Sequence, residues 1–475
     1  MSDRRNFLKT MFVSAGVIAS GIPSWAEELF ISSDSKQSTD GWAELPKILA
    51  RIKPPTFPDR DFDITKFGAV GDNKTDCTEA FNKAIAACNK AGGGRVVVPK
   101  GEFSTGAIEL RSKVNLHVSE GATIRFSRDT KKYPLVFSRW EGMELMNYSP
   151  FIYAYEQQNI AITGKGTLDG NADEEHWWSW KGSKEYGYKA GPTQMPDRKT
   201  LYAMMEKGVP PRERIFGEGH YLRPQFIQPY RCKNILIEGV RLLKSPMWQV
   251  TPALCTNVTV RDLYISAFGP NTDGCDPESC SDVLIRNCFF NTGDDCIAIK
   301  SGRNDDGRRL NVPSQNIVIQ DCTMKDGHGG VTIGSEISGG TRNVFVENCK
   351  MDSPHLDSAL RIKNNAARGG LIENIYARNV TVGQVKIAGI SIDFNYEEGP
   401  SGGHTPICRN IVVEKLKLQK SEYPLYLRGF TNAPIENISL RECEFNAEKP
   451  SLIENVKGLS VQNVRINGKL VESLG

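Results

Sequence analysis

The sequence lacks a surplus of charge of either sign, a long hydrophobic run, and any cysteine or histidine spacing typical of a metal centre. Its 59 basic and 56 acidic residues leave a net charge of +3, which argues against a nucleic-acid partner because such proteins carry a basic surplus. The apolar run Met11–Ile22 is shorter than the ~20 residues that span a bilayer. His220 and His355 have no Cys or His partner at ligand spacing, so we expect no metal site. With 39% hydrophobic and 24% charged residues, the composition is that of a folded globular protein.

The first residues resemble an export signal of the twin-arginine type. Paired arginines precede the apolar run, in Asp3-Arg4-Arg5-Asn6-Phe7-Leu8-Lys9, and Pro23-Ser24-Trp25-Ala26 resembles a cleavage site. We therefore expect residues 1–26 to be a signal peptide and the mature protein to be periplasmic or secreted, without membrane association. Residues 27–60 are expected to be an N-terminal linker. A single uncleaved anchor helix is the alternative.

A short pattern recurs through the second half of the chain. It consists of Asn, two apolar residues at alternate positions, a polar residue, and Cys, Val or Leu, and its copies start 21 to 36 residues apart. Such spacing is typical of a solenoid with loops of variable length. The copies begin at Asn234, Asn257, Asp282, Asn316, Asn343, Asn374, Asn410, Asn437 and Gly458.

Each copy predicts one strand of a parallel β-helix. The apolar residues alternate, as in a strand with one buried face, and long amphipathic helices are absent from residue 230 onward. Asparagine at one corner of every coil can stack as a ladder and tolerates a left-handed turn. Because Cys288, Cys322, Cys349 and Cys443 share one repeat position with Val and Leu, we expect a buried column of reduced thiols and no disulfides.

The predicted β-helix extends over residues 61–475. Asp76 and Glu79 resemble a helix capping box, and Ala80, Phe81, Ala84, Ile85 and Cys88 form an apolar stripe. We assign this helix as the cap of the open solenoid end. Residues 171–231 interrupt the repeats with many Trp, Tyr and Arg residues, and an insertion of that length is usually functional or an interface.

Four motifs follow one another at about one-coil intervals: Asn271-Thr272-Asp273, Gly293-Asp294-Asp295, Gly327-His328-Gly329 and Arg361-Ile362-Lys363. When the strands are aligned, Asp294 shares a column with His328, and Asp273 shares one with Asp295. Alternation directs Arg361 and Lys363 outward on one face. Since coils lie ~4.8 Å apart, these side chains are expected to converge.

Such a cluster suits glycosidic bond cleavage. Carboxylates a few ångströms apart repel one another, so at least one is pushed toward its protonated form. A protonated acid can protonate the leaving oxygen while an ionised neighbour activates water or attacks carbon. Arg361 and Lys363 supply the positive charge that a uronic acid requires.

In this order and spacing, the four motifs resemble the signature segments of glycoside hydrolase family 28, the polygalacturonases. The resemblance covers roughly residues 60–470. It implies an all-β, right-handed, single-stranded parallel β-helix that hydrolyses α-1,4-galacturonosyl bonds of pectin with inversion, without a cofactor. It further implies that Asp294 is the general acid, Asp273 and Asp295 activate water, and His328 assists the acid. Arg361, Lys363 and Tyr396 would bind galacturonate on the leaving-group side.

Several alternatives remain open at the level of sequence. Exo-acting family members resemble this chain in carrying a long insertion before the first motif, so residues 171–231, with Trp177, Trp178 and Trp180 as a sugar-stacking surface, suggest attack at chain ends. An endo-polygalacturonase and a rhamnogalacturonan-directed galacturonidase are the nearest alternatives. A pectate lyase, with Asp305-Asp306 or Glu397-Glu398 as calcium ligands, and a non-catalytic glycan-binding β-helix belong to other classes.

Overall fold

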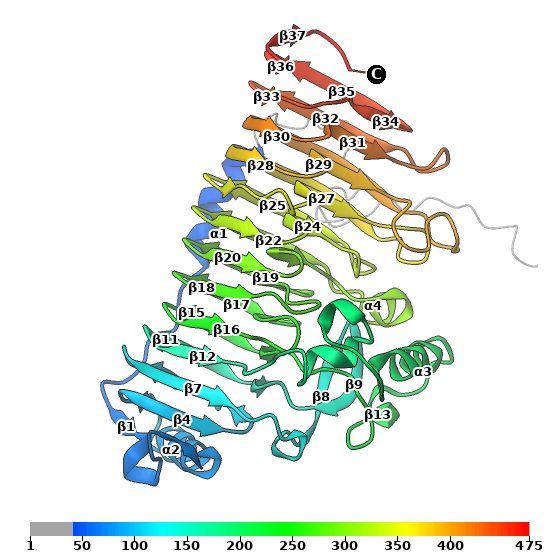
Figure 1. The fold of residues 1–475 in the computed structure, drawn as a ribbon. Coiled ribbons are helices and arrows are strands. Elements are labelled where there is room, and N and C mark those ends of the chain that lie inside the picture. Colours follow the sequence, from blue (N-terminus) through cyan, green and yellow to red (C-terminus); the bar gives the residue numbers. More distant parts are fainter. Residues whose placement is uncertain (1–40, 475) are drawn as a thin grey trace, which may run out of the picture. The chain divides into compact units, whose positions relative to one another are not determined.

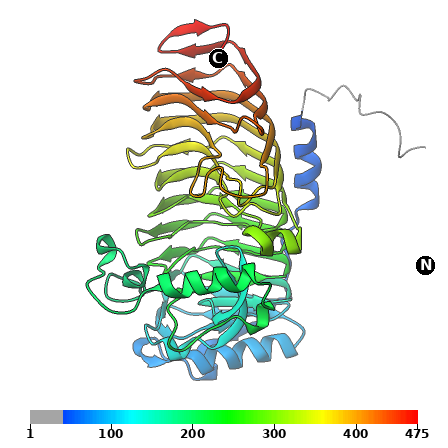
Figure 2. The ribbon, with the colours of Figure 1, turned by 90° about the vertical axis from the view of Figure 1, so that its right-hand side faces the viewer.

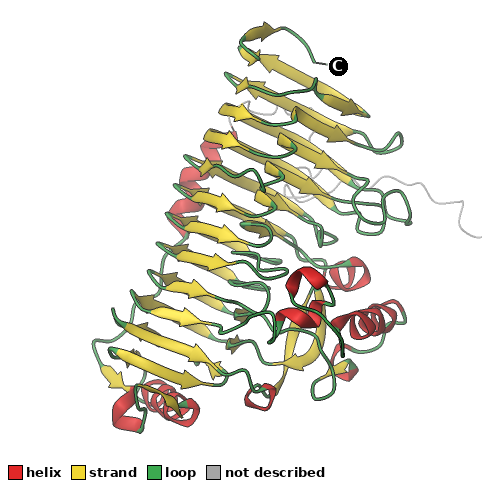
Figure 3. Cartoon of the chain, in the orientation of Figure 1, coloured by secondary structure: helices red, strands yellow, loops and turns green. Residues whose placement is uncertain are grey.

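The computed structural model describes residues 41–474, and the expected signal peptide lies outside this range. Strands stacked in parallel form most of the compact unit Trp42–Gly475, and the helices lie at its periphery (Figures 1 and 3). The four α-helices of the described range are α1 (Leu45–Arg51), α2 (Thr78–Lys90), α3 (Gln194–Glu206) and α4 (Asn304–Leu310). Its 3-10 helices are η1 (Gly41–Glu44), η2 (Ile64–Phe67), η3 (Thr130–Lys132), η4 (Trp178–Lys181), η5 (Lys184–Tyr186) and η6 (Pro211–Glu213).

The strands stack as three parallel ladders, so the predicted parallel β-helix is confirmed. The first ladder contains β1 (Asp61–Asp63), β3 (Gly94–Val98), β6 (Val114–Val118), β11 (Gln158–Gly164), β15 (Lys233–Glu238), β17 (Thr256–Arg261), β19 (Ser281–Arg286), β22 (Ser314–Gln320), β25 (Thr341–Glu347), β28 (Leu371–Gln384), β30 (Ile407–Lys420), β32 (Ile435–Arg441) and β35 (Val456–Gln462).

The second ladder runs beside the first and shares the long strands β28 and β30 with it. It contains β2 (Asp72–Asp76), β4 (Gly101–Thr105), β7 (Ala122–Phe126), β12 (Thr167–Asp169), β16 (Arg241–Leu243), β18 (Tyr264–Ala267), β20 (Phe289–Thr292), β23 (Thr323–Asp326), β26 (Lys350–Met351), β33 (Glu444–Phe445) and β36 (Val464–Ile466). A last strand, β37 (Lys469–Val471), folds back antiparallel on β36.

The four sequence motifs lie on or just before strands and bridges of the third ladder. This ladder begins with β5 (Ile108–Glu109), β10 (Ile152–Tyr155) and β14 (Ile227–Tyr230), and single bridges at Val250 and Cys275 continue it. It then runs through β21 (Ile297–Ile299), β24 (Gly329–Ile333), β27 (Ser358–Lys363), β29 (Ala388–Asp393), β31 (Tyr423–Arg428) and β34 (Leu452–Glu454). Ile297 pairs with Val331 and Val331 with Leu360, which is the register that the motif alignment predicts.

Asparagine forms the corner of successive coils. Asn257, Asn343 and the other repeat asparagines have φ between 55° and 58°, the left-handed region that Asn tolerates. Each side-chain amide donates to the residue one coil earlier, as from Asn257 to Asn234 at 2.8 Å and from Asn343 to Asn316 at 3.1 Å. The predicted ladder is thus present, and it satisfies polar groups at a corner where no strand pairing is available.

The cysteines of the chain are all buried and form no disulfide in the structure. Cys288, Cys322 and Cys349 occupy adjacent coils in one column, as expected, while Val380 and Leu416 separate Cys443 from them. A second column, which the sequence analysis missed, contains Cys232, Cys255 and Cys280. Its signal is a cysteine two residues before the corner Asn or Asp in three successive copies.

Helix α2 covers the N-terminal end of the β-helix (Figure 1) and buries Phe81, Ala84 and Ile85 against the core. Its N-terminus differs from the expected capping box. Asp76 accepts a hydrogen bond from the Thr78 backbone at 2.9 Å, whereas Glu79 forms an ion pair with Lys83. The helix therefore begins without a capping box: Asp76 bonds its first residue, and the N-cap position is Cys77, which has no side-chain cap.

Residues 41–52, expected to belong to a linker, lie against the side of the β-helix (Figure 2). Trp42, Leu45 and Ile48 are buried on Val318 and Phe345, and Trp42 also contacts the ring of Tyr376. These apolar residues recur at i, i+3 and i+6, a helical spacing that the linker assignment overlooked. Within the described residues, no helix is both long and apolar enough to cross a membrane.

The insertion forms a small layer beside the third ladder together with an earlier hairpin that the sequence analysis did not predict. Strands β8 (Leu135–Trp140) and β9 (Met143–Tyr148) pair with each other, and β13 (Ile215–Phe216) joins β9 (Figure 1). Trp140, Leu201 and Phe216 are part of its own apolar core. Buried ion pairs attach this layer to the β-helix, from Arg139 to Glu278 at 2.6 Å and from Arg214 to Asp306 at 2.7 Å.

Candidate active site

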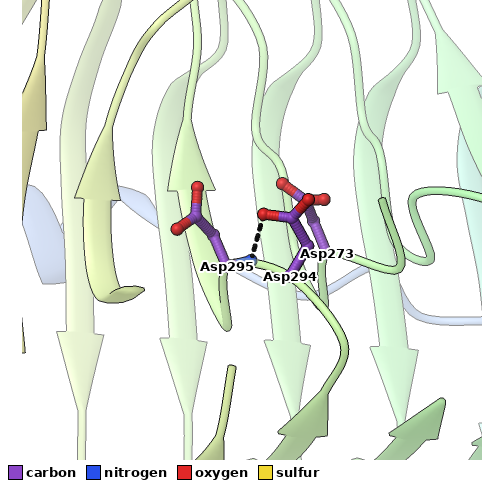
Figure 4. Close-up of side chains that lie close together, drawn as sticks. All are labelled: Asp273, Asp294 and Asp295. Carbon is purple, nitrogen blue, oxygen red and sulfur yellow. Dashed lines mark hydrogen bonds between the residues drawn. The ribbon is translucent and has the colours of Figure 1, made fainter. Parts of the chain in front are cut away.

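Three aspartates meet at the edge of the third ladder. Asp294 and Asp295 directly precede β21, and the pairing of Cys275 with Ile297 puts Asp273 one coil below Asp295. One oxygen of each carboxylate lies within 4.8 Å of the others. Figure 4 shows the carboxylates of Asp273 and Asp294 side by side, while the backbone N–H of Asp295 donates to Asp294 at 2.9 Å. The predicted convergence is therefore present.

Cations from later coils contact these carboxylates. Lys363 Nζ donates to Asp295 Oδ2 at 2.6 Å, and Arg361 Nη1 lies 3.6 Å from Asp295 Oδ1. The ring of Tyr396 lies under Lys363, with the ammonium nitrogen 5.3 Å from its centroid. His328 Nδ1 lies 3.1 Å from Asp294 Oδ1. All seven residues that the sequence predicted thus lie in one connected group: Asp273, Asp294, Asp295, His328, Arg361, Lys363 and Tyr396.

The structure adds residues that the sequence analysis did not assign. Lys300 is buried over the Trp248 ring, and its Nζ lies 3.8 Å from Asp273 and 3.1 Å from Glu336. Alternation along β21 already directs Lys300 outward next to the aspartates, so its position was predictable. Glu336, from the loop after β24, and Glu141, from the β8–β9 hairpin, line the same pocket, and nothing local in the sequence indicates that they do.

Burial and neighbouring groups shift the pKa values of the site residues in different directions. Burial raises the pKa of Asp273 well above its usual range, and the nearby Asp294 charge raises it further. Burial opposes ionisation of Asp294 too, yet the hydrogen bond from His328 holds its pKa below its usual range. The same hydrogen bond raises the pKa of His328. These shifts favour the protonated form of Asp273 and the charged forms of Asp294 and His328.

Comparisons with known proteins agree with this geometry. Residues 217–466, slightly more than half of the chain, match "Glycosyl hydrolases family 28". The chain belongs to glycoside hydrolase family 28. Residues 62–123 of this hydrolase also match "Rhamnogalacturonase A/epimerase, pectate lyase-like". A solved structure, the hyperthermoactive exopolygalacturonase of Thermotoga maritima, is 44% identical with a TM-score of 0.88, covering 91% of this chain and 97% of that one.

Curated relatives of the family 28 hydrolase are more distant. A probable polygalacturonase of Vitis vinifera is 27% identical over 84% of this chain and 77% of its own length. An exo-poly-alpha-D-galacturonosidase of Dickeya chrysanthemi is 26% identical over 77% of this chain and 60% of its own length.

Of the three tryptophans expected to form a sugar-stacking surface, Trp177 is buried, and Trp178 and Trp180 are half-buried. Trp177 is 2% exposed and packs on Tyr133 and Phe151, so it belongs to the core of this family 28 hydrolase. Trp178 donates its indole N–H to Ser245 O at 2.9 Å, and Trp180 packs on Trp177. Composition alone cannot distinguish a sugar platform from a small core, because both use aromatic residues.

The insertion nevertheless contributes to the pocket through its charged residues. Lys181 of η4 and Arg198 of α3 line it together with Glu141. Arg198 Nε donates to Glu141 Oε2 at 2.8 Å, which joins the insertion to the hairpin. Lys181 donates to Asn271, in the coil of Asp273, while Glu141 lies 3.6 Å from Arg303, which follows β21 in the coil of Asp295.

The acidic pairs considered as calcium ligands are engaged in ion pairs. Asp306 is buried and bound by Arg214, and Glu397 and Glu398 bind Arg368. Asp306 is also only 1% exposed. Asp273, Asp294 and Asp295 have the spacing of a cation site. Buried Lys300 and Lys363 already neutralise part of their charge, which disfavours a metal ion there.

Proposed function

We propose that this family 28 hydrolase cleaves α-1,4-galacturonosyl bonds of polygalacturonate and removes galacturonate from the non-reducing end. The observation that carries the proposal is the clustering of Asp273, Asp294 and Asp295 with Lys363 in one pocket, where Arg361 also pairs with Asp295. A carboxyl cluster suits glycosidic cleavage, and the adjacent cations suit a uronate leaving group. The names of the relatives, polygalacturonase and exopolygalacturonase, support the same substrate.

The roles follow from position. Asp294 donates the proton to the glycosidic oxygen, and His328 supplies it across their 3.1 Å contact. Asp273 and Asp295 hold and activate the water, which would lie between two of their oxygens that are within 4.8 Å of each other. Asp295 accepts the proton of the water, because burial favours the protonated form of Asp273. Arg361, Lys363 and Tyr396 bind the leaving galacturonate. Inversion is part of the proposal, although the usual separation of inverting carboxyl groups, ~6.5–9.5 Å, is longer.

Attack at the chain end is supported by the insertion. Lys181 of the insertion contacts Asn271, in the coil of Asp273 and therefore before the coils of Arg361 and Lys363, where a longer polymer would have to continue. A wall there leaves room for the terminal sugar and directs the rest of the chain along the later coils. Export to the periplasm or medium, through residues 1–26, belongs to the same proposal because pectin is an extracellular polymer.

The test uses trigalacturonate with wild-type enzyme and the Asp294→Asn variant. Wild-type enzyme should release saturated galacturonate, with and without excess EDTA, and NMR of fresh product should find the inverted β anomer. Asp294→Asn keeps the shape of the side chain but removes the proton donor, so kcat should fall by about 10²–10⁴-fold while the substrate still binds.

Other products would redirect the proposal. A metal-dependent, ultraviolet-absorbing unsaturated product would indicate a lyase, and the α anomer would indicate retention. Cleavage of rhamnogalacturonan but not polygalacturonate would indicate the related galacturonidase activity. Binding without any cleavage would indicate a glycan-binding protein.

A further inference from the structure

Nearly every cation that lines the pocket already has a carboxylate partner. Lys300 pairs with Glu336, Arg303 with Glu336, Arg198 with Glu141, and Lys363 with Asp295, at 2.5 to 3.1 Å. Lys181 differs. Among the residues described, no carboxylate oxygen lies within 4.0 Å of its Nζ, the limit for an ion pair.

The side chains that contact Lys181 Nζ, or share its hydrogen-bond acceptor, are neutral or cationic. Its Nζ donates to Asn271 Oδ1 at 2.9 Å, and Arg223 Nη2 donates to the same oxygen at 2.8 Å. Arg223 is fully buried and its other hydrogen bonds go to Gln194 Oε1 and the carbonyls of Pro246 and Pro270. Two cations therefore converge on one neutral amide, with Glu141 and Asp294 acting on both only from beyond ion-pair distance. An anion that approached Lys181 directly would offset the cost of removing these charges from water.

Lys181 is held rigidly enough to act as a binding group. It ends η4, whose Trp178 is fixed by its hydrogen bond to Ser245 and whose Trp180 packs on buried Trp177. One of its three ammonium hydrogens is used by Asn271, so two can still donate. Arg223 has less capacity left, since four of its five N–H groups are already donated.

The position of Asn271 relates Lys181 to the reacting bond. Asn271 Nδ2 donates to Asp294 Oδ2 at 3.3 Å, so Lys181 lies one side chain away from the proposed proton donor. It reaches the pocket from the insertion and contacts the coil of Asp273, before the coils of Arg361 and Lys363. The sugar on that side is the one whose anomeric carbon is attacked.

We propose that Lys181 binds the carboxylate of the non-reducing terminal galacturonate, with Arg223 and Asn271 positioning its ammonium group. The inference rests on the proposed function and deepens it, because it makes the enzyme selective for a terminal sugar that is itself a uronate. Arg361 and Lys363 would then bind the sugar on the leaving-group side, and Lys181 would bind the terminal galacturonate that is cut off.

The test compares trigalacturonate with the analogue in which only the non-reducing terminal carboxyl is a methyl ester. Wild-type kcat/KM should be roughly ten- to hundredfold lower for the ester, the usual worth of a hydrogen bond to a charged group. Lys181→Met should lose a similar factor on trigalacturonate and should no longer distinguish the two substrates, because the two changes remove the same contact.

Two further variants separate charge from structure. Lys181→Arg retains the cation and should keep most of the discrimination. Lys184→Met, an exposed lysine of the same insertion, should behave as wild type. Equal discrimination by wild type and Lys181→Met would overturn the inference while leaving the proposed hydrolysis intact. Failure of the wild type to release saturated galacturonate would instead overturn the proposed function.

Discussion

Asp294 and His328 share a hydrogen bond at 3.1 Å, and half of the His328 side chain is exposed, 51%. The contact lowers the pKa of Asp294 and raises that of His328, so each holds the other in its charged form. A carboxyl group with a depressed pKa is mostly ionised near neutral pH, so by itself it rarely carries a proton to donate. The pair can deliver a proton because the imidazolium keeps one close to the glycosidic oxygen.

The pH dependence of kcat/KM should therefore reveal His328. Its proton is present below its raised pKa and is lost as pH rises through that value, so wild-type activity should decline on the alkaline side above the ordinary histidine pKa of ~6.5. In His328→Gln the donor would be Asp294 alone, so the alkaline limb should move to lower pH and the maximal rate should fall.

The matched control is His355→Gln. His355 is also exposed and paired with an aspartate, Asp326, at 3.2 Å, but it does not contact the cluster. Its profile should overlay that of the wild type. An unchanged alkaline limb in His328→Gln would show that another group carries the proton.

Among the elements, the strands of the β-helix were the most predictable. Alternation around the Asn corners fixed both the strands and the register of Ile297, Val331 and Leu360, because each coil repeats a local pattern whose period matches the buried face. The four motifs were placed by the same register, so the clustering of their aspartates with Arg361 and Lys363 followed from the repeat.

The elements outside the repeat could not be predicted in the same way. The β8–β9 hairpin, Glu141 and Glu336 reach the pocket by tertiary contacts that leave no periodic trace. The burial of Trp177 depends on Tyr133 and Phe151, which lie far away in the sequence. The helix at residues 45–51 is short, so the spacing of its apolar residues is a weak signal until Val318 and Phe345 are known to contact it.

The two cysteine columns lead to a prediction about thiols. Burial raises the pKa of Cys255, in the second column, and of Cys275, outside both columns, well above the usual range, which keeps these two in the unreactive thiol form. Native enzyme should therefore react slowly with a thiol reagent, and denatured enzyme without reductant should titrate all twelve cysteines. Peptide mapping that finds disulfides between neighbouring coils would contradict the prediction.

At the scale of the molecule, the insertion and the hairpin supply Lys181, Arg198 and Glu141 to the pocket, and the later coils supply Lys363 and Tyr396. Buried ion pairs anchor the insertion and the hairpin at Arg139 and Arg214. Breaking one such pair by removing a single partner typically costs about 3–5 kcal/mol, so both are a fixed part of the fold.

Mode of attack can be measured from polymer viscosity against released reducing ends. If the wall admits only a chain end, galacturonate should accumulate while viscosity falls slowly. Replacing residues 183–192, which include η5, by a short Gly-Ser link should, if it opens the wall, move the enzyme toward internal cleavage with a faster viscosity loss. A rapid fall in viscosity and a ladder of oligomers from the wild type would show that the wall does not block the polymer.

Parallel stacking of coils is a form of templated growth, since each coil presents the backbone groups on which the next one forms. Nothing in the repeat itself limits that growth, and an uncovered terminal coil could recruit a second molecule as readily as its own chain. Helix α2 at one end and the reversed strand β37 at the other interrupt the template with a surface that cannot pair in parallel. The finite length of the enzyme, and its resistance to end-to-end fibre formation, are thus determined by its least repetitive residues.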